Sequence, residues 1–322
     1  MRSLVRVFGL LLLLIVPSCA REETEPLRLG TVLWPGSEPL FLARELGLTD
    51  DRSVRLVEYA SLGEVGRAFR NGVIDAAHMT LDMALVLQQH GFEPRVVLVL
   101  DYSHGGDALL ARPEVRRLEN LRGRKVAVED LTTSPYVLGR ALEQAGLRPS
   151  DVQIVRIPVD QQVRAYEAGE VDAVVTFEPF VDRLRRAGAH ELFDSSALPE
   201  EIIDVLVVRE DRLARYSRQV EHLLQGWFQG LEYLRRDPDG AAARMSPRLD
   251  MSPSEFTTAM RSLRLLSLDE NRALLGAPSP ALVGPARRLQ RFMLSQGLMQ
   301  EPIRSEEMLD ARFLEEVRED GR

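Results

Sequence analysis

The sequence predicts an α/β protein of two similar lobes, each built on a parallel-rich sheet covered by helices. The chain has 322 residues, of which 45% are hydrophobic, so it is long enough for about two domains. From Leu27 onward, short apolar runs rich in β-formers alternate with helical patterns, which favours parallel sheets covered on both faces. A pattern in residues 67–76 also recurs in residues 164–173.

The expected elements follow in order along the first two thirds of the chain. In the first part we expect strands at 27–33, 54–59, 74–80, 96–101 and 107–111, with helices at 38–46, 63–71 and 81–90. The alternation then restarts, with strands at 125–129, 152–157 and 171–177 and helices at 134–145, 161–168 and 178–187. The restart indicates a second lobe of the same kind.

The pattern changes after Pro199. One more strand is expected at 202–208, followed by helices at 219–236, 238–245, 252–263, 280–296 and 305–317. We therefore assign residues 27–112 to lobe I, residues 113–201 to lobe II, and residues 202–322 to a return strand and C-terminal helices that pack on lobe I. Two chain crossings between the lobes would form a hinge.

The internal repeat places an aspartate at the same point of each lobe. Each copy contains a helix, a glycine, and a short strand that begins near Asp75 or Asp172. Glycine suits the left-handed position after a helix. We expect structural roles for both aspartates, in capping or turn bonds, and we expect His78, within a strand, to be a buried core residue with its polar partners satisfied.

The N-terminus has the pattern of an export signal. Arg2 and Arg6 precede an apolar run at 7–16, which is too short for a membrane-spanning helix of ~20 residues. We interpret residues 1–18 as a signal peptide and residues 19–26 as a tether. Cys19 follows a segment that resembles a bacterial lipobox, so we expect lipidation there; Pro17 departs from that pattern, and ordinary cleavage that leaves a free thiol is the alternative. Ala20 after the cysteine favours sorting to the outer membrane.

Composition and motifs exclude several classes of protein. The net charge of −8 argues against a nucleic-acid binder, and a single cysteine rules out a disulfide framework and a cysteine-based zinc site. The sequence has no Gly-x-Ser-x-Gly elbow, no phosphate-binding P-loop and no histidine cluster typical of a metal site. We therefore expect a binding protein without cofactor or metal, and no enzyme.

The loops that follow the strands carry acidic side chains. In open α/β sheets, ligands bind at the carboxyl ends of the strands. The acidic residues there are Glu38, Asp82, Asp101, Asp107, Glu129, Asp130 and Glu178, and the same loops contain no Lys or Arg. This favours a ligand with positive charge or hydrogen-bond donors, such as an aminopyrimidine, urea, guanidine or amine, over a sulfonate or nitrate. Helix N-termini in these loops, including Ser134 as an expected N-cap, favour an anion instead, and the carboxylates could also cap helices or bond across the hinge.

Several segments resemble one family of binding proteins. The run at 30–43 and the segments at 71–77, 101–107, 121–127 and 169–179 resemble, in order, the SsuA-like substrate-binding proteins of ABC importers for nitrate, sulfonates, taurine, urea-like compounds and thiamine pyrimidine precursors. The resemblance implies a type II periplasmic-binding-protein fold with an inter-lobe cleft. It implies these cleft residues: Trp34, Thr80, Asp101, Tyr102, Ser103, Ser134, Tyr136 and Glu178. The acidic pattern adds Glu38.

These observations predict a lipid-anchored receptor outside the cytoplasm, on the periplasmic side of a bacterial membrane. It would act as a monomer, hold a small polar molecule between its lobes and deliver it to an ABC permease. The alternative is a ligand-sensing lipoprotein that signals to a membrane partner. An enzyme of the wider family, which makes the thiamine pyrimidine, depends on a cysteine-rich motif that this chain lacks.

Overall fold

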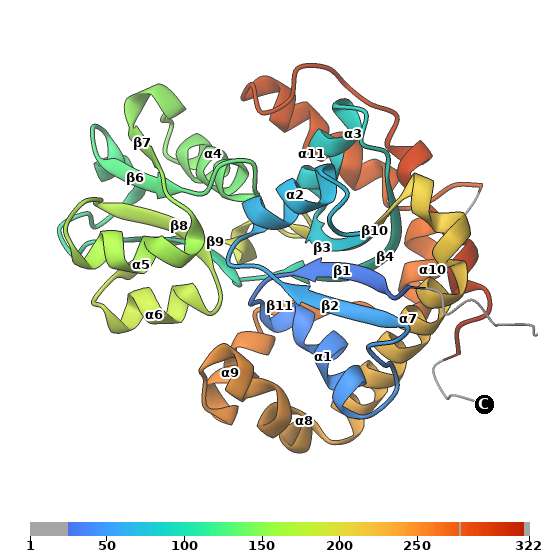
Figure 1. Ribbon diagram of the computed structural model, residues 1–322. Coiled ribbons are helices and arrows are strands. Elements are labelled where there is room, and N and C mark those ends of the chain that lie inside the picture. Colours follow the sequence, from blue (N-terminus) through green and yellow to red (C-terminus); the bar gives the residue numbers. More distant parts are fainter. Residues whose placement is uncertain (1–24, 277, 319–322) are drawn as a thin grey trace, which may run out of the picture.

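The computed structural model describes residues 25–276 and 278–318, which form two α/β lobes side by side (Figure 1). The expected signal peptide and Cys19 lie outside the described residues. Lobe II contains the second sheet and helices α4 to α6, on the left of the figure. Lobe I contains the first sheet and all the other helices.

Lobe I is built on a six-stranded sheet in the order β11-β4-β10-β3-β1-β2. Strands β1 (Leu27–Thr31), β2 (Val54–Glu58) and β3 (Ala76–Thr80) are parallel. Strand β10 (Ile203–Arg209) runs antiparallel between β3 and β4 (Pro94–Ser103), and the short β11 (Leu263–Leu265) completes the edge. The expected return of the chain to lobe I through a strand near 202–208 is confirmed.

Lobe II repeats this arrangement in a five-stranded sheet, in the order β7-β6-β8-β5-β9. Strands β6 (Lys125–Val128), β7 (Gln153–Arg156) and β8 (Ala173–Phe177) are parallel, while β5 (Asp107–Ala111) is antiparallel to both β8 and β9 (His190–Asp194). In each sheet, three neighbouring parallel strands therefore lie beside an antiparallel strand that enters from the other side of the hinge.

This pairing corrects the expected lobe boundary at residue 112. Strand β5 pairs with β8 through five residue pairs in the second sheet, so the chain leaves lobe I between Ser103 and Asp107. The sequence pattern gave no register, and an apolar strand pairs equally well with either sheet. Strand β9 was not expected, since Leu192 and Phe193 are its two apolar residues and the other three are polar.

Helices cover the faces of both sheets. Lobe I has α1 (Glu38–Glu45), α2 (Leu62–Arg70) and α3 (Leu81–Gln89), and lobe II has α4 (Ser134–Gln144), α5 (Val159–Glu167) and α6 (Phe180–Arg186). Gly72 and Gly169, which follow α2 and α5, have φ values of +67° and +77°. Both glycines thus occupy the left-handed position that the repeat predicted.

The C-terminal third packs on lobe I, as expected. It comprises α7 (Glu210–Arg236), which is kinked at Tyr216, then α8 (Pro238–Met245), α9 (Pro253–Met260), α10 (Leu268–Leu275) and α11 (Val283–Ser295). Helix α10 was not expected.

The expected helix at 305–317 is wrong, because this segment forms two short 3₁₀ turns, Ser305–Met308 and Arg312–Leu314. Between them, the N–H of Asp310 donates to the Val96 carbonyl on β4, and Phe313 and Leu314 are buried. Tertiary contacts therefore override the amphipathic pattern.

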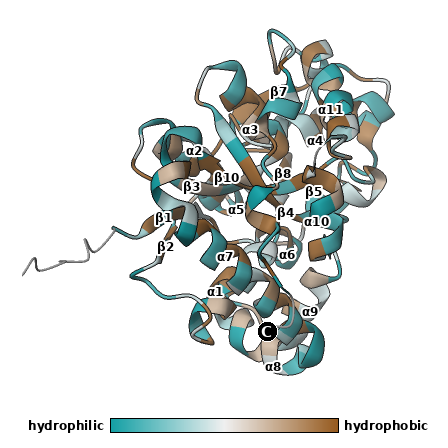
Figure 2. Cartoon of the chain, turned by 90° about the vertical axis from the view of Figure 1, so that its right-hand side faces the viewer, coloured by the Kyte–Doolittle hydropathy of each residue, from teal (hydrophilic) through white to brown (hydrophobic). Residues whose placement is uncertain are grey.

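Hydrophobic residues lie mainly on the central strands, and hydrophilic ones on the outer helices and loops (Figure 2). One apolar cluster extends across both sheets and includes Trp34 and Phe177, which meet edge to face at 5.7 Å from opposite lobes. Within the described residues, no helix has the length and apolar character needed to cross a membrane. The hinge and this contact together hold the two lobes in contact.

Candidate functional site

A small cavity lies where the carboxyl ends of the strands of both lobes meet. It has a volume of about 10 Å³, close to the space needed for one water molecule. Lobe I contributes residues from the loop after β1, from β3, from the first turn of α2 and from β10. Lobe II contributes the first residue of β5, the last residue of β8 and the loop before α4. The lining residues are Val32, Trp34, Leu62, His78, Thr80, Asp107, Thr133, Phe177 and Asp204.

Two buried aspartates face each other across neighbouring strands at this cavity. Asp101 on β4 is paired in register with Asp204 on β10, and their exposed fractions are 0% and 5%. Directly opposite residues of an antiparallel pair have side chains about 5 Å apart. Neither carboxyl oxygen of Asp101 has a hydrogen-bond partner of good geometry among the described residues, although the Trp34 indole N–H and the Asp204 carboxyl group lie close enough to affect its titration.

His78 connects Asp204 to a chain of hydroxyl groups. Its Nε2 lies 2.9 Å from Asp204 Oδ1, and its Nδ1 lies 2.6 Å from Ser37 Oγ, which accepts a hydrogen bond from Thr31. The prediction of a buried histidine with satisfied partners is confirmed. His78 also lines the cavity, which that prediction did not include.

Trp34 and Thr80 are predicted site residues that line the cavity. Both are buried, and neither Trp34 Nε1 nor Thr80 Oγ1 has a hydrogen-bond partner of good geometry among the described residues. The indole N–H points toward Asp101 and lowers the pKa that burial raises there. Gly36 permits this approach, because a Cβ atom at that position would collide with both Trp34 Nε1 and Asp101 Oδ2.

Burial shifts the titration of every ionisable group around the cavity. It raises the pKa of Asp101 and of Asp204 well above the usual aspartate value, and the neighbouring carboxylates raise both further. Burial also raises the pKa of Asp107 to about 7 and lowers the pKa of His78 to about 4. A neutral imidazole and partly protonated carboxyl groups are the forms that a buried site without a cation favours.

Seven of the nine predicted site residues do not line the cavity, and three of these seven make contacts elsewhere. Glu38 is fully buried but pairs with Arg248 at 3.1 Å on another face of lobe I, and burial raises its pKa to about 8. Tyr102 packs under the Arg264 guanidinium at 4.7 Å, because successive residues of a strand face opposite sides. Tyr136 donates to Glu201 at 2.6 Å and packs edge to face against Phe292.

Three others support the hinge or the second lobe. Ser103 Oγ lies 2.8 Å from Ser195 Oγ and accepts the N–H of Asp107, so it joins the two chain crossings. Ser134 is the first residue of α4 rather than its N-cap, which is Thr133 without a side-chain cap bond. Glu178, whose pKa burial raises to about 7, accepts the N–H of Asp182 at 3.2 Å.

Sequence reasoning missed Asp204 and did not single out Asp107 as a site residue. Asp204 is the one charged residue inside an otherwise apolar strand up to Val208, and that signal was visible in the sequence. Its position beside Asp101 was not visible, because it depends on the antiparallel register of β10 with β4. No group of three or more metal-binding side chains gathers within the part of the chain that the structure describes.

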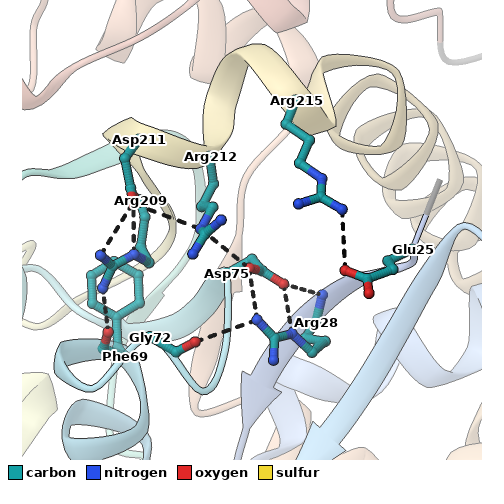
Figure 3. Close-up of polar contacts among 9 residues, drawn as sticks. All are labelled: Glu25, Arg28, Phe69, Gly72, Asp75, Arg209, Asp211, Arg212 and Arg215. Carbon is teal, nitrogen blue, oxygen red and sulfur yellow. Dashed lines mark hydrogen bonds and ion pairs between the residues drawn. The ribbon is translucent and has the colours of Figure 1, made fainter.

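Another carboxyl group, that of Asp75 just before β3, lies among arginine side chains (Figure 3). Asp75, at the start of β3, is fully buried and accepts hydrogen bonds from the backbone N–H of Arg28 at 3.1 Å and from its guanidinium at 2.9 and 3.0 Å. Arg212 of α7 lies 3.7 Å away. In lobe II, Asp172 accepts the backbone N–H of Lys125 at 2.9 Å and pairs with Arg124 at 3.4 Å. The repeat thus has the expected structural role in both lobes.

The two lobes, the doubled hinge and the cavity between them define the type II periplasmic-binding-protein fold. Residues 20–246 match the NMT1-like family, and the chain belongs to this family.

Relatives of known identity are binding proteins. The taurine-binding periplasmic protein of Escherichia coli is 25% identical over 182 residues, which cover 56% of this chain and only 55% of that protein. The alkanesulfonate-binding protein SsuA of Xanthomonas axonopodis pv. citri, solved bound to MOPS, superimposes with a TM-score of 0.73 at 18% identity over 86% of this chain and 96% of that one. The desulfurization enzyme DSZB shares the fold, with a TM-score of 0.64 at 17% identity over 90% of this chain and 97% of its own.

Proposed function

We propose that this protein is the extracytoplasmic receptor of an ABC importer and that it captures a small cationic molecule between its lobes. The observation that carries the ligand class is the acidic lining of the cavity. Asp107 and Asp204 line it, Asp101 lies directly behind them, and within the described residues no Lys or Arg side chain lines it. Recognition of a free anion normally uses arginine or lysine.

The aspartates are suited to a ligand with several N–H donors. Asp101 has two unpartnered oxygens, and an amidinium or guanidinium group presents paired donors that match a carboxylate. A bound cation would lower the pKa values that burial raises at Asp101, Asp107 and Asp204, so it would stabilise the ionised site. The Trp34 and Phe177 rings provide flat apolar walls for a planar ligand.

The similar proteins that bind taurine or alkanesulfonates argue for a ligand of negative charge instead. Helices α3 and α4 both begin at the cavity, after Thr80 and Thr133, and helix N-termini attract anions. However, Asp82 already occupies the first turn of α3, where it accepts from Thr133 at 3.2 Å. We therefore expect the carboxyl groups rather than the helix ends to decide the charge of the ligand.

The membrane attachment is part of the same proposal. A lipid on Cys19 would tether lobe I through the residues that precede β1 and would hold the receptor near a membrane permease. A cell-fractionation experiment on the wild type and Cys19→Ala tests this attachment. The wild type should partition with membranes, and Cys19→Ala should be soluble or uncleaved.

A thermal-shift panel on residues 21–322 tests the ligand class. One group of compounds contains an aminopyrimidine, urea, methylguanidine and ethanolamine; the other contains nitrate, bicarbonate, ethanesulfonate and taurine. Taurine and ethanolamine share an ammonium group, while taurine and ethanesulfonate share a sulfonate, so this trio separates the two charges. A ligand at 100 times its Kd adds about 2.7 kcal/mol of stability, which corresponds to a shift of several degrees.

The proposal predicts shifts in the first group, and a shift with ethanolamine but not with ethanesulfonate. A shift with ethanesulfonate and none with any amine would contradict the cationic ligand while leaving the receptor role intact. Turnover of any compound by the purified protein would contradict the receptor role itself.

A further inference from the structure

Helix α2 of lobe I has its N-terminus completed by the opposite lobe. The first N–H groups of any helix lack partners within the helix. Ser61, the N-cap, accepts the N–H of Glu64 with its side chain. The N–H of Gly63 donates instead to Glu129 Oε1 at 3.0 Å, and Glu129 belongs to lobe II, directly after β6. Burial raises the pKa of Glu129, and the bonds from Ser61 and Gly63 counteract this shift because they favour the ionised carboxylate.

The close approach of the two lobes depends on the absence of a side chain at Gly63. A Cβ atom there would lie 2.9 Å from Glu129 Oε1 and 3.6 Å from the Asp130 carbonyl oxygen. Gly66, one turn further along the same helix, faces its own lobe, where a Cβ atom would meet the Met83 methyl group at an ordinary 3.6 Å. The two glycines therefore differ in a way that helix geometry alone does not explain.

A second contact from the same lobe II loop reaches the next helix of lobe I. Thr133 Oγ1 donates to Asp82 Oδ1 at 3.2 Å in the first turn of α3. Thr132 holds this loop in shape by donating to the Glu129 carbonyl at 2.9 Å. Residues 129–133 thus engage two helix N-termini of lobe I. Glu129 itself is only 4% exposed, and it does not line the cavity.

We propose that Glu129 and Gly63 form a latch that holds the lobes closed without touching the captured molecule. The existence of the latch is inferred from the geometry alone. Its purpose rests on the proposed function, which is the capture of a ligand between the lobes. Glu129 is accordingly a positioning residue. It affects how long the lobes stay closed, whereas the side chains that line the cavity determine which ligand binds.

The test measures lobe closure directly and contains no ligand. Residues 21–322 contain no cysteine, so Val73→Cys and Ile154→Cys, which are 52% and 42% exposed in the wild type, place one spin label on each lobe. Double electron–electron resonance then reports the population at the separation seen in this structure. Hydrogen exchange of the segment 61–66 gives a second, independent readout.

Glu129→Ala and Gly63→Ala should each reduce the ratio of closed to open molecules about tenfold or more, as loss of a hydrogen bond to a charged group implies. Exchange at residues 61–66 should accelerate correspondingly. Glu129→Gln, which retains an acceptor oxygen, should have an intermediate effect. Asp130→Ala and Gly66→Ala are the matched controls, for charge and for helix propensity, and should leave the closed population unchanged.

Equal distance distributions and equal exchange in the wild type, Glu129→Ala and Gly63→Ala would overturn the latch. Equal losses in Gly63→Ala and Gly66→Ala would overturn it as well, since they would indicate helix destabilisation alone. Failure of every compound in the thermal-shift panel would count against the proposed ligand and would leave these measurements unaffected.

Discussion

Two buried aspartates of the first sheet have opposite surroundings, and the difference distinguishes a structural carboxyl group from one that we propose for ligand binding. Asp75, at the amino end of β3, is surrounded by Arg28 and Arg212, and its oxygens accept a backbone N–H and two guanidinium N–H groups (Figure 3). Asp101, at the carboxyl end of β4, is equally buried and has neither a cation nor a hydrogen-bond partner of good geometry among the described residues. A buried charge is normally paired. We therefore propose that an external cation binds beside Asp101, which has no such partner in its ionised form.

The largest effect should follow from breaking the structural carboxyl group. Asp75→Ala leaves Arg28 and Arg212 without their shared partner, and breaking a buried ion pair costs about 3–5 kcal/mol of unfolding free energy. Arg28 is 40% exposed, so solvent screening places the loss at the low end of that range. Urea denaturation measures the loss. Unchanged stability would show that the cluster does not hold the amino ends of β1 and β3 together.

Asp101→Asn should reduce ligand affinity rather than stability. It removes a buried carboxyl group that has no partner, so we expect stability to be unchanged or higher. Affinity for a cationic ligand should fall about tenfold or more, because a charge-assisted hydrogen bond is lost. Titration calorimetry and urea denaturation of the same variant measure both. Loss of stability without loss of affinity would assign Asp101 to the fold rather than to the site.

The pH dependence of stability should also reflect the buried ionisable groups at the cavity. Burial raises the pKa of Asp107 to about 7, so the folded state retains a proton that the unfolded state releases near pH 4, and stability falls as pH rises through this window. The lowered pKa of His78, about 4, has the opposite effect, but only below about pH 6.5. We therefore expect the Tm to fall from pH 6.5 to 8.

Asp107→Asn should make this fall shallower than in the wild type by about 2 °C. Differential scanning fluorimetry at intervals of half a pH unit resolves the two. A Tm that rises between pH 6.5 and 8 would be incompatible with protonated carboxyl groups at the cavity.

The smallest effect should come from the counterpart of Asp75 in lobe II. The Asp172 side chain is 27% exposed and its partner Arg124 is 46% exposed, so solvent screens the pair. We expect Asp172→Ala to cost about 1 kcal/mol, mainly through the lost bond to the Lys125 N–H. A loss as large as that of Asp75→Ala would mean that burial does not explain the difference between the lobes.

The sequence predicted local elements and the repeat better than it predicted the pairing of distant strands. Periodicity located β1 to β3 and α1 to α3, and the recurring Asp75 and Asp172 have the structural roles expected. The crossing strand β5 carries no signal for the sheet that it joins, and this left β5 in the wrong lobe. Strand β10 was expected in lobe I, but its register with β4 was not visible in the sequence, and this left Asp204 unnoticed.

The same limit affected the predicted site. Trp34, Thr80 and Asp101 are at or beside the cavity, since their position at the ends of strands could be predicted from the chain. Glu38 also follows a strand end, but its partner Arg248 is 210 residues away, and no local pattern shows such a contact. Tyr102 was misplaced because it was grouped with Asp101, although neighbours on a strand face opposite sides.

The pH dependence of ligand affinity tests the central claim most directly. The compound with the largest thermal shift is titrated into residues 21–322 by calorimetry from pH 6 to 8. Asp101, Asp107 and Asp204 must ionise to hold a cation, and burial raises all three pKa values, so the account predicts that affinity rises with pH. A best ligand that is an anion, or a cation whose affinity falls as the pH rises, would contradict it.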